Sequence, residues 1–179
     1  MRKYFISAVI AAVGALVLGG YVSASGVGDQ SNNAKARLDG FQENPSISTT
    51  GTGSLDLRID DDAQEIEFEL SYEDLEGVAP FVTGGVVQAA HIHVSARGVN
   101  GGVSAFFCGG GGKPPCPSPS GTVTGVIRPA DIVGPANQGI NPGEPTAFAE
   151  LVRAIRAGYT YGNVHTTRWP GGEIRGQVQ

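Results

Sequence analysis

The sequence predicts an all-β protein, an antiparallel β-sandwich or Greek-key-like barrel with one short amphipathic helix before a C-terminal hairpin. Two observations support this fold class. Runs of alternating apolar and polar residues recur along the chain, and turn-forming residues separate them, with 28 Gly and 11 Pro among 179 residues. After the apolar N-terminal segment, a single stretch has helical spacing instead. Its apolar residues are Phe148, Leu151, Val152 and Ile155. We therefore expect seven or eight short strands around one core.

The N-terminus has the pattern of an export signal. Arg2 and Lys3 precede an uncharged run from Tyr4, and this run ends in the small-residue site Val22-Ser23-Ala24. The pattern predicts a signal peptide at residues 1–24 and a secreted protein, extracellular or periplasmic. An uncleaved membrane anchor is the alternative, because the run approaches spanning length. Residues 25–35 are small and polar and predict a flexible linker, which leaves a domain at 36–179.

The charge of the exported chain excludes some partners. Removing residues 1–24 takes away two of the 12 basic residues and none of the 17 acidic ones, so the net charge changes from −5 to −7. A domain with this charge does not suit nucleic acid or an anionic membrane surface. We expect a metal ion or an extracellular protein as the partner, and the sequence does not identify that protein.

The first strands are predicted with a buried and an exposed side. Residues 36–40 form a short strand, and a hairpin of 53–59 and 65–72 follows, with an acidic turn at 60–62. The alternating apolar residues of the hairpin are Leu55, Leu57, Ile59, Ile66, Phe68 and Leu70. Because alternate side chains share a face, these six are expected to line the core.

Three further strands are expected at 86–95, 103–107 and 121–127, and two cysteines lie between the last two. Cys108 and Cys116 are the only cysteines, and an exported protein meets an oxidising compartment, so we predict a disulfide. Metal binding or redox catalysis is the alternative. The C-x7-C spacing lacks the C-x-x-C arrangement that lowers a thiol pKa.

The C-terminal hairpin combines an apolar side with a polar one. It follows the helix, which begins near Pro145 and ends at Gly158, and it turns at Pro170-Gly171-Gly172. Alternation places Tyr159, Tyr161, Asn163, His165, Glu173, Arg175 and Gln177 on one side, and Val164, Ile174 and Val178 on the other. Only registers that place His165 opposite Glu173 or Arg175 keep the apolar residues together.

The three histidines form a candidate metal site. His91 and His93 share one face of their strand, about 6.6 Å apart along it, and His165 has the matching orientation on its own strand. If the two strands are neighbours, all three imidazoles converge, with Glu173, Tyr161 or Arg175 as additional ligand or supporting residue. Nitrogen ligands suit copper or zinc better than calcium or magnesium. The alternative is that the histidines only complete a polar surface.

These motifs resemble the CHRD domain, the module named for chordin. The resemblance rests on Ala36-Arg-Leu-Asp-Gly40, Glu43-Asn-Pro45, Ala90-His-Ile-His93, Asn100-Gly101, Tyr161-Gly-Asn-Val-His-Thr166 and Pro170-Gly-Gly-Glu-Ile-Arg-Gly-Gln177. It covers residues 34–179 and implies an extracellular β-rich module. Growth-factor antagonism does not carry over, because the cysteine-rich repeats that accompany these modules in chordin are absent here.

The His-x-His pair with a distant histidine also resembles part of the copper site of copper/zinc superoxide dismutases. Those enzymes need additional histidines and an Asp for two metals, and this chain has three histidines in total. The resemblance therefore implies one metal at most and not dismutation. We expect a secreted binding module with one copper or zinc ion. A metal-free structural or adhesive domain is the main alternative, and a metal-dependent redox enzyme is a weaker one.

Overall fold

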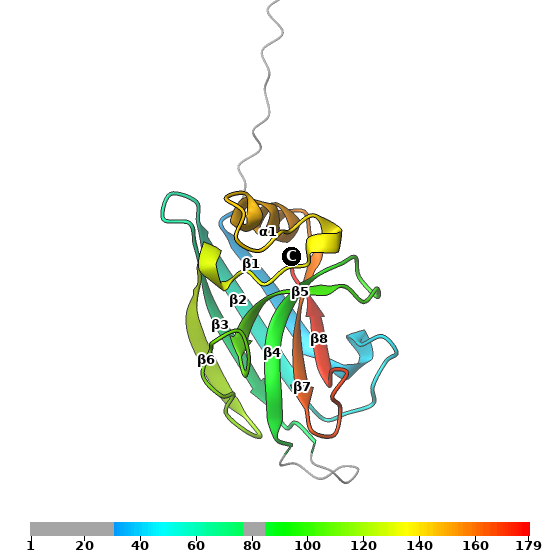
Figure 1. Cartoon of the computed structure of the whole chain (residues 1–179). Coiled ribbons are helices and arrows are strands. Elements are labelled where there is room, and N and C mark those ends of the chain that lie inside the picture. The colour runs from blue at the N-terminus through cyan, green and yellow to red at the C-terminus, as the bar shows by residue number, and fades with distance from the viewer. Residues whose placement is uncertain (1–30, 77–84) are drawn as a thin grey trace, which may run out of the picture.

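The computed structural model describes residues 31–76 and 85–179. Its strands form one antiparallel sheet in the order β5-β4-β7-β8-β1-β2-β3-β6 (Figure 1). The strands are β1 (Asn33–Asp39), β2 (Thr52–Asp60), β3 (Glu65–Glu73), β4 (Val87–Val94), β5 (Gly102–Cys108), β6 (Gly121–Ile127), β7 (Thr160–Thr166) and β8 (Ile174–Gln177). The predicted signal peptide and residues 25–30 of the predicted linker lie outside the described residues.

The sheet curls until its two outer strands, β5 and β6, approach each other, which leaves a nearly closed barrel (Figure 1). The all-β prediction is confirmed. Of its two forms, the structure is closer to the barrel, because every strand belongs to one sheet.

The interior of the barrel holds the residues that alternation predicted. Leu55, Leu57, Ile59, Ile66, Phe68, Leu70, Ile92, Val164, Ile174 and Val178 are all buried in one hydrophobic core. Phe68 also packs against Phe107 of β5, with ring centroids 4.8 Å apart. This contact joins the two ends of the sheet, β3 beside β6 and β5, and stabilises the near-closure of the barrel.

The helix α1 (Ala147–Arg156) lies across one end of the barrel (Figure 1). Its predicted apolar face, Phe148, Leu151, Val152 and Ile155, is buried. It is followed by Gly158, whose φ of +73° favours glycine. Among the described residues, none forms a helix with the length and hydropathy needed to cross a membrane.

The first strand begins earlier than expected. β1 starts at Asn33, so residues 33–35, predicted as linker, are part of the sheet. Their backbone pairs with β2, and Lys35 and Gln179 exchange two backbone hydrogen bonds of 2.8 and 2.9 Å. Pairing on both sides therefore extends the strand over residues 33–35, of which only Ala34 is buried in the core.

Cys108 at the end of β5 is bonded to Cys116, so the predicted disulfide is confirmed. The bond closes a loop whose Gly110 and Gly111 lie against the ring of Phe106. The loop therefore supports an aromatic side chain of β5 as well as closing the chain on itself.

Candidate metal centre

The three histidines lie on two neighbouring strands. β4 and β7 pair directly, with Ala89 opposite His165, His91 opposite Asn163, and His93 opposite Tyr161. Residues opposite one another in an antiparallel pair share a face, so all three histidines project from the same side of the sheet. Ile92 and Val164 project to the other side and are fully buried in the core. The adjacency of the two strands, which the sequence could only assume, is therefore confirmed.

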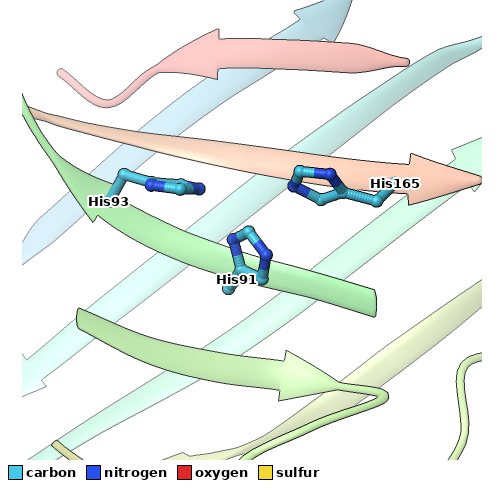
Figure 2. Close-up of side chains that lie close together, drawn as sticks. All are labelled: His91, His93 and His165. Atoms are coloured by element: carbon cyan, nitrogen blue, oxygen red, sulfur yellow. The ribbon is translucent and has the colours of Figure 1, made fainter. Parts of the chain in front are cut away.

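The rings face one another across the strand pair (Figure 2). The ring centroid of His91 lies 4.5 Å from that of His93 and 4.4 Å from that of His165, and the other two are 6.4 Å apart. One nitrogen of each ring lies within 4.8 Å of the others. Two nitrogens on one ion at about 2.1 Å are at most about 4.2 Å apart, so small side-chain movements complete the site.

Backbone carbonyls orient two of the rings. Nδ1 of His93 donates to the carbonyl of Gly101 and Nδ1 of His165 donates to the carbonyl of Pro170, both at 2.9 Å. A carbonyl only accepts, so Nδ1 carries the proton in each ring and Nε2 keeps a free lone pair. Metal-bound histidines are commonly held in this way through their second nitrogen.

Three other ring nitrogens have no hydrogen-bond partner among residues 31–76 and 85–179. Nε2 of His93, Nε2 of His165 and Nδ1 of His91 are all buried without a hydrogen bond. Buried polar atoms are nearly always paired, and an unpaired one costs free energy. Three such atoms within one cluster are what a metal ion would satisfy, so these residues could hold one.

Burial also sets the protonation of the cluster. Desolvation is the main cause that lowers the pKa of His91 to about 2 and of His93 to about 4, and repulsion from His165 adds to both shifts. Desolvation lowers the pKa of His165 as well. The imidazoles are therefore neutral at pH 7, the form that binds metals.

The polar side of the hairpin is buried under other segments of the chain. Asn163, Arg175 and Gln177 are only 3%, 1% and 7% exposed. Gln177 donates to the carbonyl of Ser95, and Arg175 donates to the side chain of Asn100 at 3.1 Å. Segments that follow β4 therefore cover the outside of β7 and β8 and form a second, polar layer.

The structure places Tyr161 and Arg175 beside the histidines. The ring of Tyr161 stacks on that of His93, with centroids 4.5 Å apart and planes 4° from parallel. The guanidinium carbon of Arg175 lies 3.4 Å from the centroid of the Tyr161 ring. Tyr161 also accepts a hydrogen bond from the amide of Gly101 at 3.2 Å, so this stack supports His93.

Glu173 does not join the histidines, contrary to expectation. One carboxylate oxygen accepts from the Thr49 hydroxyl and the Glu76 amide, and the other accepts from the Thr166 hydroxyl, all at 2.7 Å. β8 begins only at Ile174, and φ of Gly172 is +123°, so Glu173 belongs to the turn. Strand alternation therefore does not determine the direction in which the Glu173 side chain points.

Two residues near the site were missed from the sequence. Glu43 is 9% exposed and accepts a 2.6 Å hydrogen bond from Asn163, and burial raises its pKa to about 7. Phe106 packs edge-on against His91, with ring centroids 5.1 Å apart. Glu43 lies in a turn and Phe106 in an apolar strand, so neither segment carries a signal that points to the histidines.

The sequence model of the CHRD domain matches residues 34–178. The chain belongs to the CHRD family. CHRD domains are extracellular, and the disulfide of this CHRD domain fits that setting. The matched range includes all three histidines and both cysteines. No curated protein and no solved structure gives a significant match to the chain.

Proposed function

We propose that the chain is a secreted CHRD domain that binds a single copper or zinc ion through His91, His93 and His165. The observation that carries this proposal is a cluster of three histidines that each have one buried, unpaired ring nitrogen and that each offer a ring nitrogen within 4.8 Å of the others. A bound ion would satisfy these atoms together.

The chemistry of the donors supports copper or zinc. Three neutral imidazoles form a nitrogen-only set, which these ions prefer and which calcium and magnesium do not. The carbonyls of Gly101 and Pro170 hold two rings with Nε2 available, and Tyr161 supports the ring of His93. Rings that are already held in place lose less side-chain entropy when a metal ion binds.

A metal-free structural or adhesive domain is the second candidate, and the same two hydrogen bonds favour it. His93 ties β4 to Gly101, and His165 ties β7 to Pro170 in the turn before β8. In this role the histidines would hold the connecting segments in place, and their free nitrogens would have no ligand.

Metal analysis separates the two candidates. The chain is purified without a polyhistidine tag, its metal content is measured, and the metal-free protein is titrated with copper and zinc. We expect one ion per chain, and we expect His91→Ala and His165→Ala to weaken binding by at least about 100-fold. Ser71→Ala, on the outer face of β3, is the matched control. Absence of binding by the wild-type chain would leave the structural candidate.

A further inference from the structure

The histidine centre has three protein donors and no fourth. Among residues 31–76 and 85–179, no Cys, Asp or Glu joins the three histidines in a group that can hold a metal. Both oxygens of Glu173 accept hydrogen bonds elsewhere, and the hydroxyl of Tyr161 accepts one from Gly101. The described side chains therefore leave a four-coordinate ion with one position to fill.

The direction of the donors places that position away from the sheet. All three histidines project from one face of the β4 and β7 pair, as the ladder between these strands requires (Figure 2). The three histidines therefore contact such an ion only on the side that faces the sheet. The fourth position then points away from the strands, where none of the three histidines reaches.

The charge of the surroundings favours an anion there. Three neutral imidazoles bring no negative charge, and the nearby charges of Arg175 and Glu43 act on each other. Glu43, the carboxylate of the same polar layer, is held by Asn163 at 2.6 Å. A buried cation without a compensating charge is costly, and a small anion at the fourth position offsets that cost.

The size of the site restricts that anion. His91 and His93 are each only 7% exposed, and Phe106 packs against the ring of His91. Gly110 and Gly111 of the disulfide loop hold Phe106 from behind. Because the rings are largely covered, an ion of a few atoms has easier access to them than a bulky organic anion.

We propose that the metal-loaded centre binds one small inorganic anion directly at the fourth position of the ion. This inference rests on the proposed function. Hydroxide derived from water is the simplest member of this class, and azide is a suitable probe. The anion occupies the coordination position that the three histidines leave, on the side of the ion that faces away from the sheet.

The copper(II)-loaded chain is titrated with sodium azide and followed by visible absorption and electron paramagnetic resonance. We expect a new charge-transfer band that saturates, an altered copper hyperfine pattern, and copper that remains bound on gel filtration. Sodium perchlorate at equal ionic strength and sodium benzoate should produce neither change, because the first binds metals weakly and the second is too large.

The outcomes separate the two proposals. Copper that stays bound while azide changes neither spectrum would overturn the anion site and leave metal binding intact. Copper removed by azide would also overturn the anion site, because azide would then have displaced the histidines instead of binding beside them. A wild-type chain that binds no copper at all would overturn both proposals.

The variant Glu43→Gln tests whether this carboxylate is a hidden fourth ligand. The substitution keeps the side-chain shape and an oxygen that can accept from Asn163, and it removes the negative charge. We expect azide to bind the variant at least as tightly as the wild type. A response to azide seen only in the variant would identify Glu43 as the fourth ligand and overturn the anion site.

Discussion

Two buried polar clusters flank β7, and they differ in how well their polar atoms are paired. In the Glu173 cluster (Glu173, Thr49, Thr166 and the amide of Glu76), a fully buried carboxylate accepts three hydrogen bonds of 2.7 Å. In the histidine cluster (His91, His93 and His165), three buried nitrogens have no partner. Both clusters are covered, so burial by itself does not distinguish them.

The difference in pairing separates a structural role from a binding role. The hydrogen bonds of Glu173 link Thr49, Glu76 and β7, segments far apart in the chain, so this cluster stabilises the fold. The histidine cluster carries the cost of unpaired atoms in a metal-free chain, and a ligand would recover that cost. Substitutions should therefore affect stability at Glu173 and metal binding at the histidines.

The largest loss of stability is expected for Glu173→Ala. The substitution leaves the hydroxyls of Thr49 and Thr166 and the amide of Glu76 without their acceptor. We expect the free energy of unfolding of the metal-free chain to fall by about 3–5 kcal/mol in denaturant titration.

Glu67→Ala is the control for this substitution, because Glu67 is an exposed carboxylate paired with Arg58 at 3.0 Å. It should change stability by no more than about 1 kcal/mol. Similar losses for the two variants would show that the Glu173 cluster has no special structural role.

A neighbouring pair on β4 tests the two faces of the same strand. Ile92 is fully buried in the core and His91 is 7% exposed on the outer face. Ile92→Ala should cost about 2–5 kcal/mol through lost burial and a residual cavity. His91→Ala should cost well under half of that in metal-free protein, because no hydrogen bond to its ring nitrogen Nδ1 is lost. Equal costs in chemical unfolding would contradict the assignment of faces.

The disulfide should contribute less to stability than Glu173 or Ile92. Replacing both Cys108 and Cys116 by Ser removes a cross-link with a sequence separation of 8. The unfolding free energy should fall by about 2–3 kcal/mol on the chain-entropy model. An unchanged unfolding midpoint, with both substitutions verified by mass spectrometry, would show that the loop is ordered without the bond.

The smallest effect is expected from mild acidification of the metal-free chain. Desolvation lowers the pKa of His91 and His93 from 6.5 to about 2 and about 4, so the unfolded chain takes up these protons first. Stability is then present above pH 6.5 and declines as the pH falls toward 4. Burial raises the pKa of Glu43 from 4.5 to about 7, and this stabilises the fold at low pH and opposes the decline.

Because the histidines outnumber Glu43, the melting temperature should fall by roughly 2–4 °C between pH 7 and pH 6. The decline should be steeper in Glu43→Gln, which lacks the opposing group, and shallower in His91→Ala. Calorimetry in the presence of a chelator measures all three profiles. A melting temperature that rises on acidification would mean that the histidines are not shielded from water as the structure shows.

Much of the fold follows from local sequence patterns. Alternation identifies the core residues of β2 and β3, helical spacing identifies the buried face of α1, and two cysteines in a chain with a predicted export signal identify the disulfide. The same alternation orients His91, His93 and His165 toward one face. These features depend on backbone geometry within one or two adjacent elements, which the sequence determines directly.

Other features depend on contacts between distant segments, and only the tertiary structure decided them. The pairing of β4 with β7 brings His165 to His91 across more than seventy residues of chain. The segments that bury Arg175 and the turn that directs Glu173 to Thr49 likewise come from elsewhere in the sequence. A strand pattern specifies which face a side chain takes, but what covers that face is set by how the remaining chain packs, because burial is a property of the whole fold.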